Sequence, residues 1–600
     1  MLEAIWEERQ RALVGRGRSK GRRSVPTGRE YRGGAGFLGV GAALHHCFFP
    51  ERLLSAATKM AFAVSLFLAA LLLWVAAAGD ESYVERDTTE GKVRGRLVRA
   101  IGRNVEEYRG IPFAEPPLGK LRFRPPVRKA PWEGTLDTTT LKLTACPQEE
   151  MPLIKMGDVA YTEDCLHLNV WVPQSAKEPG SSQPVMVWIH GGGFTFGSAN
   201  EPSYNGANLA TLGDVLVVSM NYRLGILGFM SANSPEAPGN VGLLDQLEVL
   251  KWVQRNIASF GGDPERVTIF GESAGAASVH CHVMSPMSEG LFKRAVLLSG
   301  TMYNIDMWDM IHESMVKGNK VADIVGCSKK GTIDLSANAE DVIRCFRRKS
   351  ADELMKASFE SVAPKVVPFY PIYHDSFLPK MPLVAMNRGF FGSIDVVAGV
   401  TSDEGALMPM FPPKPELLAE DLQVSEKLGD ALHATVSTWL KEDVPDVLDK
   451  YIADAPNGDG NALRRQYLDY SADRMFYCPL RFFADKHSER GNRVFAYVFD
   501  HKSATAPFPG WTGVPHAAEL AFLFGHKYAE DPDSPDGRMS EEFVRALTSF
   551  AEKGFPELPE KRKWPRYTKQ APVMIVMGHG QFNETQEFRK SQCERWKYLF

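Results

Sequence analysis

One serine lies in a glycine-bounded turn and is the first residue whose setting suggests chemistry. Ser273 belongs to "GESAG" (271–275), which fits the pattern G-x-S-x-G. A chain of this length and ordinary composition contains roughly 0.3 copies of that pattern by chance, so the pentapeptide alone decides little. The apolar run "RVTIF" precedes it and the helical stretch "AASVHCHVM" follows it. A strand, a sharp turn and a helix in this order present a serine as a nucleophile at the top of a sheet.

A serine nucleophile also needs hydrogen-bond donors for the oxyanion that forms when it attacks a carbonyl. The stretch "HGGGF" (190–194) ends another apolar run about eighty residues earlier. Consecutive glycines leave backbone N–H groups free to approach a substrate. We expect the N–H groups of Gly192, Gly193 and Ala274 to form the oxyanion hole.

The serine further requires a base and an acid that orients it. Ten of the fourteen histidines follow the serine in the chain. His280 and His282 lie in the helix directly after it and are too close to turn back. His516, in the Gly/Pro-containing loop "WTGVPHAAEL", is the candidate base. Glu404 and Asp403, in "TSDEG" after the run "IDVVAGV", are both candidate acids, and the residues alone leave the choice open.

Apolar runs that alternate with helical stretches must position these groups. Strands are expected at "PVMVWI", "DVLVVSM", "RVTIF", "RAVLL", "IDVVAGV" and "RVFAYVF", and a helix at "NVGLLDQLEVLKWVQRNIASF". Unbroken apolar strands are typical of a sheet that is covered on both faces. The alternation predicts an α/β fold with a large, mostly parallel central sheet flanked by helices. In such sheets, functional residues follow the carboxyl ends of the strands.

The composition is that of a globular protein. The 600 residues are 44% hydrophobic and 24% charged, with a net charge of −4, which argues against a nucleic-acid partner. The sequence contains no P-loop, dinucleotide fingerprint or metal-binding motif, so we expect no cofactor and no metal. A small-molecule substrate is the expected partner, and the oligomeric state is not predicted.

The N-terminal part differs from the rest. Residues 1–59 carry eleven Lys/Arg against five Glu, and residues 60–78 are an apolar run ending in small residues. We interpret 60–78 as a cleaved signal peptide and 1–59 as an extension absent from the mature protein. The alternative is an uncleaved membrane anchor with a basic cytoplasmic tail. Both place residues 79–600, expected to be a single domain, outside the cytosol, and we favour secretion.

Several longer stretches resemble the type-B carboxylesterases, a family that includes the cholinesterases and insect esterases. They include "EYRGIPFAEPPLGKLRFRPP", "EDCLHLNVWVP", "VWIHGGGF", "FGGDPERVTIFGESAGAASV", "TSDEG" and "GVPHAAEL", in family order over about residues 84–595. The chain looks most like a secreted esterase of the arthropod type. The resemblance implies an α/β-hydrolase fold with the active site at the base of a gorge. It also implies a Ser273–Glu404–His516 triad, so Asp403 is not the acid.

The same resemblance implies supporting features. Glu272 would line the gorge floor and Ser299 would lie behind the triad acid. The implied disulfides are Cys146–Cys165, Cys327–Cys345 and Cys478–Cys593, the implied buried ion pairs are Arg122–Glu163 and Arg223–Asp245, and Cys281 would stay a free thiol. Asn583 begins the sequon Asn-Glu-Thr, which is a candidate glycosylation site.

Departures from the family pattern bear on the substrate. Cholinesterases carry a choline-binding Trp between the first two paired cysteines, and residues 147–164 contain none. Trp511 matches another aromatic of the family, and Trp308 is a further possible replacement. The expected acyl-pocket stretch, "VVPFYPIYHD" (366–375), begins with Val and Pro. We expect a serine esterase that prefers uncharged esters. The alternatives are an acetylcholinesterase-like enzyme and a catalytically silent adhesion protein of the same fold.

Overall fold

The computed structural model describes residues 83–140, 143–149, 159–177, 181–329, 334–410, 413–441, 444–456 and 458–600. Residues from Tyr83 to Phe600 form one compact unit. The basic extension (1–59) and the apolar segment (60–78) lie outside the described residues.

A sheet of thirteen strands runs through the described part of the chain. In spatial order its strands are β1 (Tyr83–Asp87), β2 (Lys92–Ala100), β3 (Arg103–Pro112), β7 (His167–Pro173), β9 (Leu216–Met220), β8 (Gln183–Ile189), β10 (Gly262–Glu272), β11 (Arg294–Leu298), β12 (Asp395–Thr401), β13 (Val494–Phe499), β14 (Met574–Gly578) and β15 (Gln581–Thr585), with β4 (Thr135–Asp137) beside β2. A separate pair joins β5 (Thr144–Ala145) and β6 (Ala160–Tyr161).

The centre of the sheet is parallel, as the sequence predicts. The seven strands from β9 to β14 in the spatial order pair in parallel. The strands toward both edges pair antiparallel, except that β4 pairs with β2 in parallel. All six apolar runs form central strands, namely β8 to β13. Neighbouring residues of β10 point to opposite faces: Ile269 belongs to one buried cluster and Phe270 to another. The sheet is therefore covered on both sides, which explains the unbroken apolar runs within its central strands.

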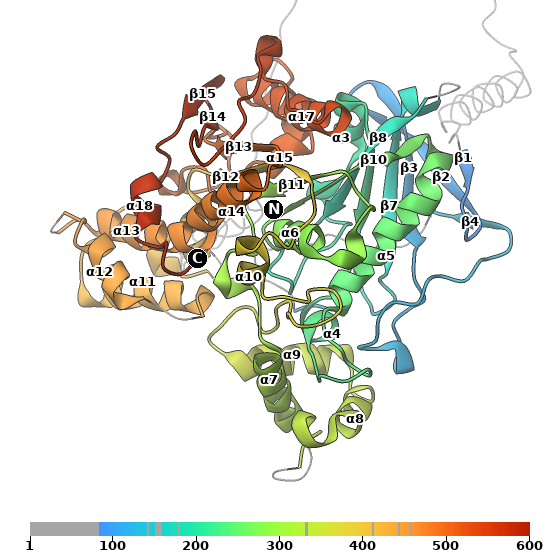
Figure 1. The fold of residues 1–600 in the computed structure, drawn as a ribbon, viewed down its shortest axis with the longest axis horizontal. Coiled ribbons are helices and arrows are strands. Elements are labelled where there is room, and N and C mark those ends of the chain that lie inside the picture. The colour runs from blue at the N-terminus through green and yellow to red at the C-terminus, as the bar shows by residue number, and fades with distance from the viewer. Residues whose placement is uncertain are drawn as a thin grey trace, which may run out of the picture. The chain divides into compact units, whose positions relative to one another are not determined.

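The helices cover both faces of this sheet (Figure 1). They are α3 (Ala207–Gly213), α4 (Gly225–Phe229), α5 (Val241–Asn256), α6 (Ala274–Met284), α7 (Ile311–Ile324), α8 (Leu335–Phe346), α9 (Ala351–Val362), α10 (Pro382–Asn387), α11 (Glu426–Trp439), α12 (Pro445–Ile452), α13 (Gly460–Ala472), α14 (Cys478–Glu489), α15 (Leu520–Leu523), α16 (His526–Glu530), α17 (Pro535–Lys553) and α18 (Lys590–Glu594). Side chains of α5, α6 and α14 pack into one cluster, and those of α3 and α17 pack into the other.

Covalent and ionic links join segments that are distant in the chain. The structure contains the three disulfides that the resemblance implies, Cys146–Cys165, Cys327–Cys345 and Cys478–Cys593, and it leaves Cys281 as a buried thiol. The two implied ion pairs also form, Arg122 with Glu163 and Arg223 with Asp245. The first pair fixes the chain next to the Cys146–Cys165 loop, and the second joins the start of α4 to α5.

Candidate active site

Ser273 lies in a strained turn between β10 and α6. Its backbone has φ 57° and ψ −123°, a conformation that residues with a side chain rarely adopt. The turn is possible because its flanking glycines approach their neighbours closely. A Cβ on Gly275 would lie 2.1 Å from the carbonyl oxygen of Ile189, and one on Gly271 would lie 2.5 Å from the carbonyl carbon of Gly275. The predicted strand, turn and helix are therefore all present.

The triple-glycine loop lies directly against this turn. A Cβ on Gly191 would lie 3.2 Å from the Cβ of Ser273. Gly192 and Gly193 have φ angles of 102° and 60°, which favour glycine. Ala274 is the first residue of α6, where backbone N–H groups have no acceptor within the helix. The structure thus brings the three proposed oxyanion donors to the two segments that meet at Ser273.

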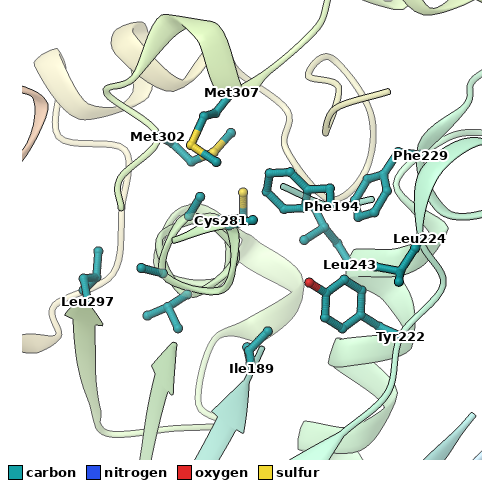
Figure 2. Close-up of a cluster of buried hydrophobic side chains, with 14 of the residues drawn as sticks. Ile189, Phe194, Tyr222, Leu224, Phe229, Leu243, Cys281, Leu297, Met302 and Met307 are labelled. Atoms are coloured by element: carbon teal, nitrogen blue, oxygen red, sulfur yellow. The ribbon is translucent and has the colours of Figure 1, made fainter. Parts of the chain in front are cut away.

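A buried cluster supports both segments (Figure 2). Phe194, which follows the glycines, packs on Phe229 of α4 with ring centroids 5.0 Å apart. Cys281 of α6 faces Phe194 on one side and Met302 on the other in Figure 2. The first turn of α6 and the glycine loop therefore share one packed core, which fixes their relative position.

His516 and Glu404 form a buried pair. Nδ1 of His516 lies 2.5 Å from Oε2 of Glu404. The other carboxylate oxygen of Glu404 accepts a hydrogen bond from the backbone N–H of Thr401 at 2.8 Å, and the Glu404 side chain is fully buried. Glu404 directly follows the turn after β12, so the strand end and this hydrogen bond aim its carboxylate at the imidazole.

Asp403 has a different set of partners. Its carboxylate accepts a hydrogen bond from the backbone N–H of Val514 at 2.9 Å and pairs with Arg465. These contacts hold the loop that carries His516 against the end of β12. The structure therefore places Glu404, and not Asp403, on the imidazole.

The second imidazole nitrogen faces the residue before the serine. Nε2 of His516 lies 2.9 Å from Oε1 of Glu272, which is also buried. Burial by itself lowers the pKa of His516, because desolvation disfavours the imidazolium. The negative charges of Glu272 and Glu404 outweigh burial and hold the pKa of His516 well above its ordinary 6.5. The histidine is thus placed between two carboxylates beside the nucleophile turn.

Two further buried acids near this site were not singled out from the sequence. The Ser299 hydroxyl, expected behind Glu404, donates a hydrogen bond to Glu519 at 3.4 Å. Burial, followed by the charges of Glu272 and Glu404, raises the pKa of Glu519 to about 8. Burial likewise raises the pKa of Glu201 to about 7. An acid three residues after the candidate histidine and directly before "LAFLF" was the only available signal for Glu519.

The described part of the chain lacks features typical of a metal site or a membrane span. It contains no group of three or more His, Cys, Asp or Glu side chains that could hold a metal ion. None of its helices has both the length and the apolar composition needed to cross a bilayer. A cavity of about 630 Å³ lies at the carboxyl end of α6, the end opposite Ser273, and is lined by Met284, Phe390 and Lys380 among others.

Comparison with known proteins agrees with this geometry. The family model described as "Carboxylesterase family" matches residues 82–596. The chain belongs to the carboxylesterase family. It is also 33% identical to the acetylcholinesterase of Bungarus fasciatus over an alignment of 553 residues, which covers 87% of this chain and 87% of that relative. This carboxylesterase is accordingly a hydrolase of carboxylic esters with the α/β-hydrolase fold of its family.

Proposed function

We propose that this protein cleaves esters through an acyl-enzyme formed on Ser273. His516 takes the proton of the Ser273 hydroxyl as it attacks the ester carbonyl. Glu404 holds the imidazole in the tautomer with Nδ1 protonated and stabilises the imidazolium. The N–H groups of Gly192, Gly193 and Ala274 bind the oxyanion. Water then attacks the acyl-enzyme with His516 again as the base, and no metal or cofactor takes part.

The single observation that carries this proposal is the position of the His516 ring. Its Nδ1 is 2.5 Å from Glu404, and its Nε2 is 2.9 Å from Glu272, the residue adjacent to Ser273 in the strained turn. A base that is oriented on one side by a carboxylate, and that lies beside the nucleophile turn on the other, supports acyl transfer, in which the base must reach the serine hydroxyl.

We further propose that uncharged esters are preferred over choline esters. A quaternary ammonium is held chiefly by an aromatic face. The two rings that could replace the missing Trp already carry cations of the protein itself. The Arg464 guanidinium lies 4.0 Å from the ring centroid of Trp511, and the Lys441 ammonium lies 5.4 Å from that of Trp308. These contacts support a site in which neither ring is free to hold a second cation on the same face.

The proposal is tested with a fluorophosphonate probe and two substrates. The probe is expected to label Ser273 in the intact protein, as read by peptide mass spectrometry, and not to label Ser273→Ala. On the titrated enzyme, 1-naphthyl butyrate is expected to give a higher kcat/KM than acetylthiocholine. An unlabelled, inactive but folded protein would instead indicate the catalytically silent adhesion protein.

Choline-ester hydrolysis is the second candidate, and the relationship to the Bungarus fasciatus acetylcholinesterase favours it. The same substrate pair separates the two, because a cation site worth about 2 kcal/mol changes binding roughly 30-fold. A higher kcat/KM for acetylthiocholine would establish this second candidate.

We also propose that the protein is secreted after cleavage near Gly79 and carries a glycan on Asn583. Disulfides persist in oxidising compartments, and Asn583 is exposed on β15. N-terminal mass spectrometry of protein from the culture medium is expected to begin near Gly79, with a mass shift at Asn583 that glycosidase treatment removes. Retention of residues 1–59 would support the membrane-anchored alternative.

A further inference from the structure

The segment 365–370 contacts the glycine loop and a charge cluster that is centred on a buried carboxylate. At its inner side, Cγ2 of Val367 would lie 3.1 Å from a Cβ added to Gly193, and Val367 itself is buried. Val367 therefore limits the space next to a proposed oxyanion donor. Val367 also belongs to the stretch 366–375, which the family resemblance implies as the acyl pocket.

On its outer side, the segment meets a fully buried carboxylate shared by two lysines. Asp309 Oδ2 lies 2.5 Å from the ammonium of Lys317 on α7, and its Oδ1 lies 3.1 Å from the ammonium of Lys441, which follows α11. The backbone N–H of Tyr370 donates to Asp309 Oδ2 at 3.3 Å. We refer to Asp309, Lys317 and Lys441 as the Asp309 cluster.

Both lysines of the Asp309 cluster also lie over aromatic rings. The ammonium of Lys317 is 5.5 Å from the ring centroid of Tyr370, and that of Lys441 is 5.7 Å from it. Both distances are within the range of a cation–π attraction, which is stronger where the partners are desolvated. Tyr370 is thus held through its ring by two cations and through its backbone by Asp309.

The beginning of the segment is fixed to the same region of the fold. The ammonium of Lys365 donates to the carbonyl oxygens of Ser437 and Leu440 at the end of α11. Cations are favourable at this position, because the last carbonyl groups of a helix have no partner within it. The backbone N–H of Lys441 donates to Asp306 at 2.7 Å, so the end of α11 is itself anchored. Both ends of the segment are therefore tied to the residues that follow α11.

Burying the Asp309 carboxylate fully, and the two lysine ammonium groups in part, costs desolvation free energy that a well-packed apolar core would not require, so stability alone is a weak explanation for the cluster. We propose that the Asp309 cluster positions segment 365–370 so that Val367 is held against the glycine loop, and that it thereby sets the acyl-chain length this esterase accepts. Lys441 and Lys317 are positioning residues in this proposal, since they act through Tyr370 and Val367. The inference rests on the proposed acyl-enzyme chemistry and on the acyl-pocket stretch that the resemblance implies, and it adds the charged groups that position this stretch.

The test measures kcat/KM for 4-nitrophenyl acetate, butyrate and hexanoate with Lys441→Met, which keeps an unbranched side chain one atom shorter and removes its charge. If segment 365–370 is no longer held in place, the ratio of kcat/KM for the hexanoate to that for the acetate is expected to rise at least about threefold, a change of about 0.65 kcal/mol. Lys441→Arg, which keeps the charge, is expected to stay within about twofold of the wild type. The matched control is Arg86→Met, which removes a cation from the partly buried pair with Glu106 at the edge of the sheet.

A second series separates positioning from general damage. For 4-nitrophenyl butyrate and ethyl butyrate, which differ only in the alcohol, the ratio of the two kcat/KM values is expected not to change in Lys441→Met. In this proposal segment 365–370 faces the acyl group and not the alcohol. An unchanged acyl ratio in the folded variant, or an equal change in both series, would overturn the proposal. If Lys441→Met does not fold, Lys317→Met is measured with the same two criteria. A wild-type protein that neither turns over esters nor labels at Ser273 would refute the proposed function instead, which keeps the two failures distinct.

Discussion

Replacing Glu404 by Gln tests the proposed acid at the level of single hydrogen bonds. The two oxygens of Glu404 serve two groups, the backbone N–H of Thr401 at 2.8 Å and Nδ1 of His516 at 2.5 Å. A glutamine has one carbonyl oxygen, so it satisfies the buried Thr401 N–H only by turning its NH₂ group toward the imidazole. That donor requires an unprotonated Nδ1, which places the ring proton on Nε2. The histidine then cannot accept the proton of Ser273.

The expected loss follows from this wrong tautomer. An amide in place of the triad acid typically lowers kcat by about 10³–10⁴-fold, which corresponds to about 4–5.5 kcal/mol of transition-state stabilisation. Asp403→Asn is the matched control. Its carbonyl oxygen still accepts a hydrogen bond from Val514. The pair that it loses is with Arg465, whose side chain is 46% exposed, and ion pairs near the surface are worth about 0–1 kcal/mol. A loss of no more than about fivefold is expected for this control.

Both variants are assayed with 4-nitrophenyl butyrate, with protein amounts normalised by folded fraction from thermal denaturation. The ratio between the variants is the informative quantity, since it removes effects common to any change at the end of β12. If Asp403→Asn loses more activity than Glu404→Gln, or if Glu404→Gln stays within tenfold of the wild type, the assignment of the acid is wrong.

Three further predictions follow from the site. The kcat/KM of the wild type is expected to rise with pH through a midpoint above 6.5, because His516 must be neutral to act and two carboxylates raise its pKa. Glu272→Gln removes one of these carboxylates, so the midpoint of its pH–rate profile is expected to lie at lower pH than that of the wild type. A profile that is the same in both proteins would contradict the Glu272 contact. Gly275→Ala is expected to lower the free energy of unfolding, measured with heat or urea, by about 1–3 kcal/mol or more, because its Cβ would lie 2.1 Å from the carbonyl oxygen of Ile189. Cys281 is expected to resist N-ethylmaleimide until the protein is unfolded, because burial raises the pKa of its thiol well above the ordinary value; fast labelling of the native protein would show that α6 is accessible.

The centre of the fold was predictable because its determinants are local. Each of the six strands β8 to β13 contains an unbroken apolar run, and the glycines around Ser273 mark a turn that only small residues permit. The edge strands were not predicted. In β2, "KVRGRLVRA", charged residues recur along the strand because much of its surface remains in contact with solvent. The signal of a doubly covered strand is therefore absent there.

The candidate triad could be predicted from the sequence, because each of its residues lies in a recognisable motif and the motifs follow one another in family order. The contacts around the triad could not be predicted. The contact of His516 with Glu272 and the hydrogen bond of Ser299 to Glu519 depend on how strand ends meet in space. The Asp309 cluster was even less predictable from the sequence. Its lysines are separated by more than a hundred residues, and no local pattern distinguishes either of them from an ordinary surface lysine.

The candidate catalytic groups are attached to the sheet in two different ways. Ser273 and Glu404 follow β10 and β12, which are separated only by β11, so at about 4.8 Å per strand their anchor points are about 10 Å apart. The sheet fixes this distance for as long as its ladder is intact. His516, in contrast, arrives on a loop seventeen residues beyond the end of β13, and much of residues 502–510 is exposed to solvent. Such segments open locally at a lower free energy than the core. On gentle heating, turnover is therefore expected to disappear reversibly by local unfolding of this loop, at a temperature at which the sheet still gives a native circular dichroism spectrum.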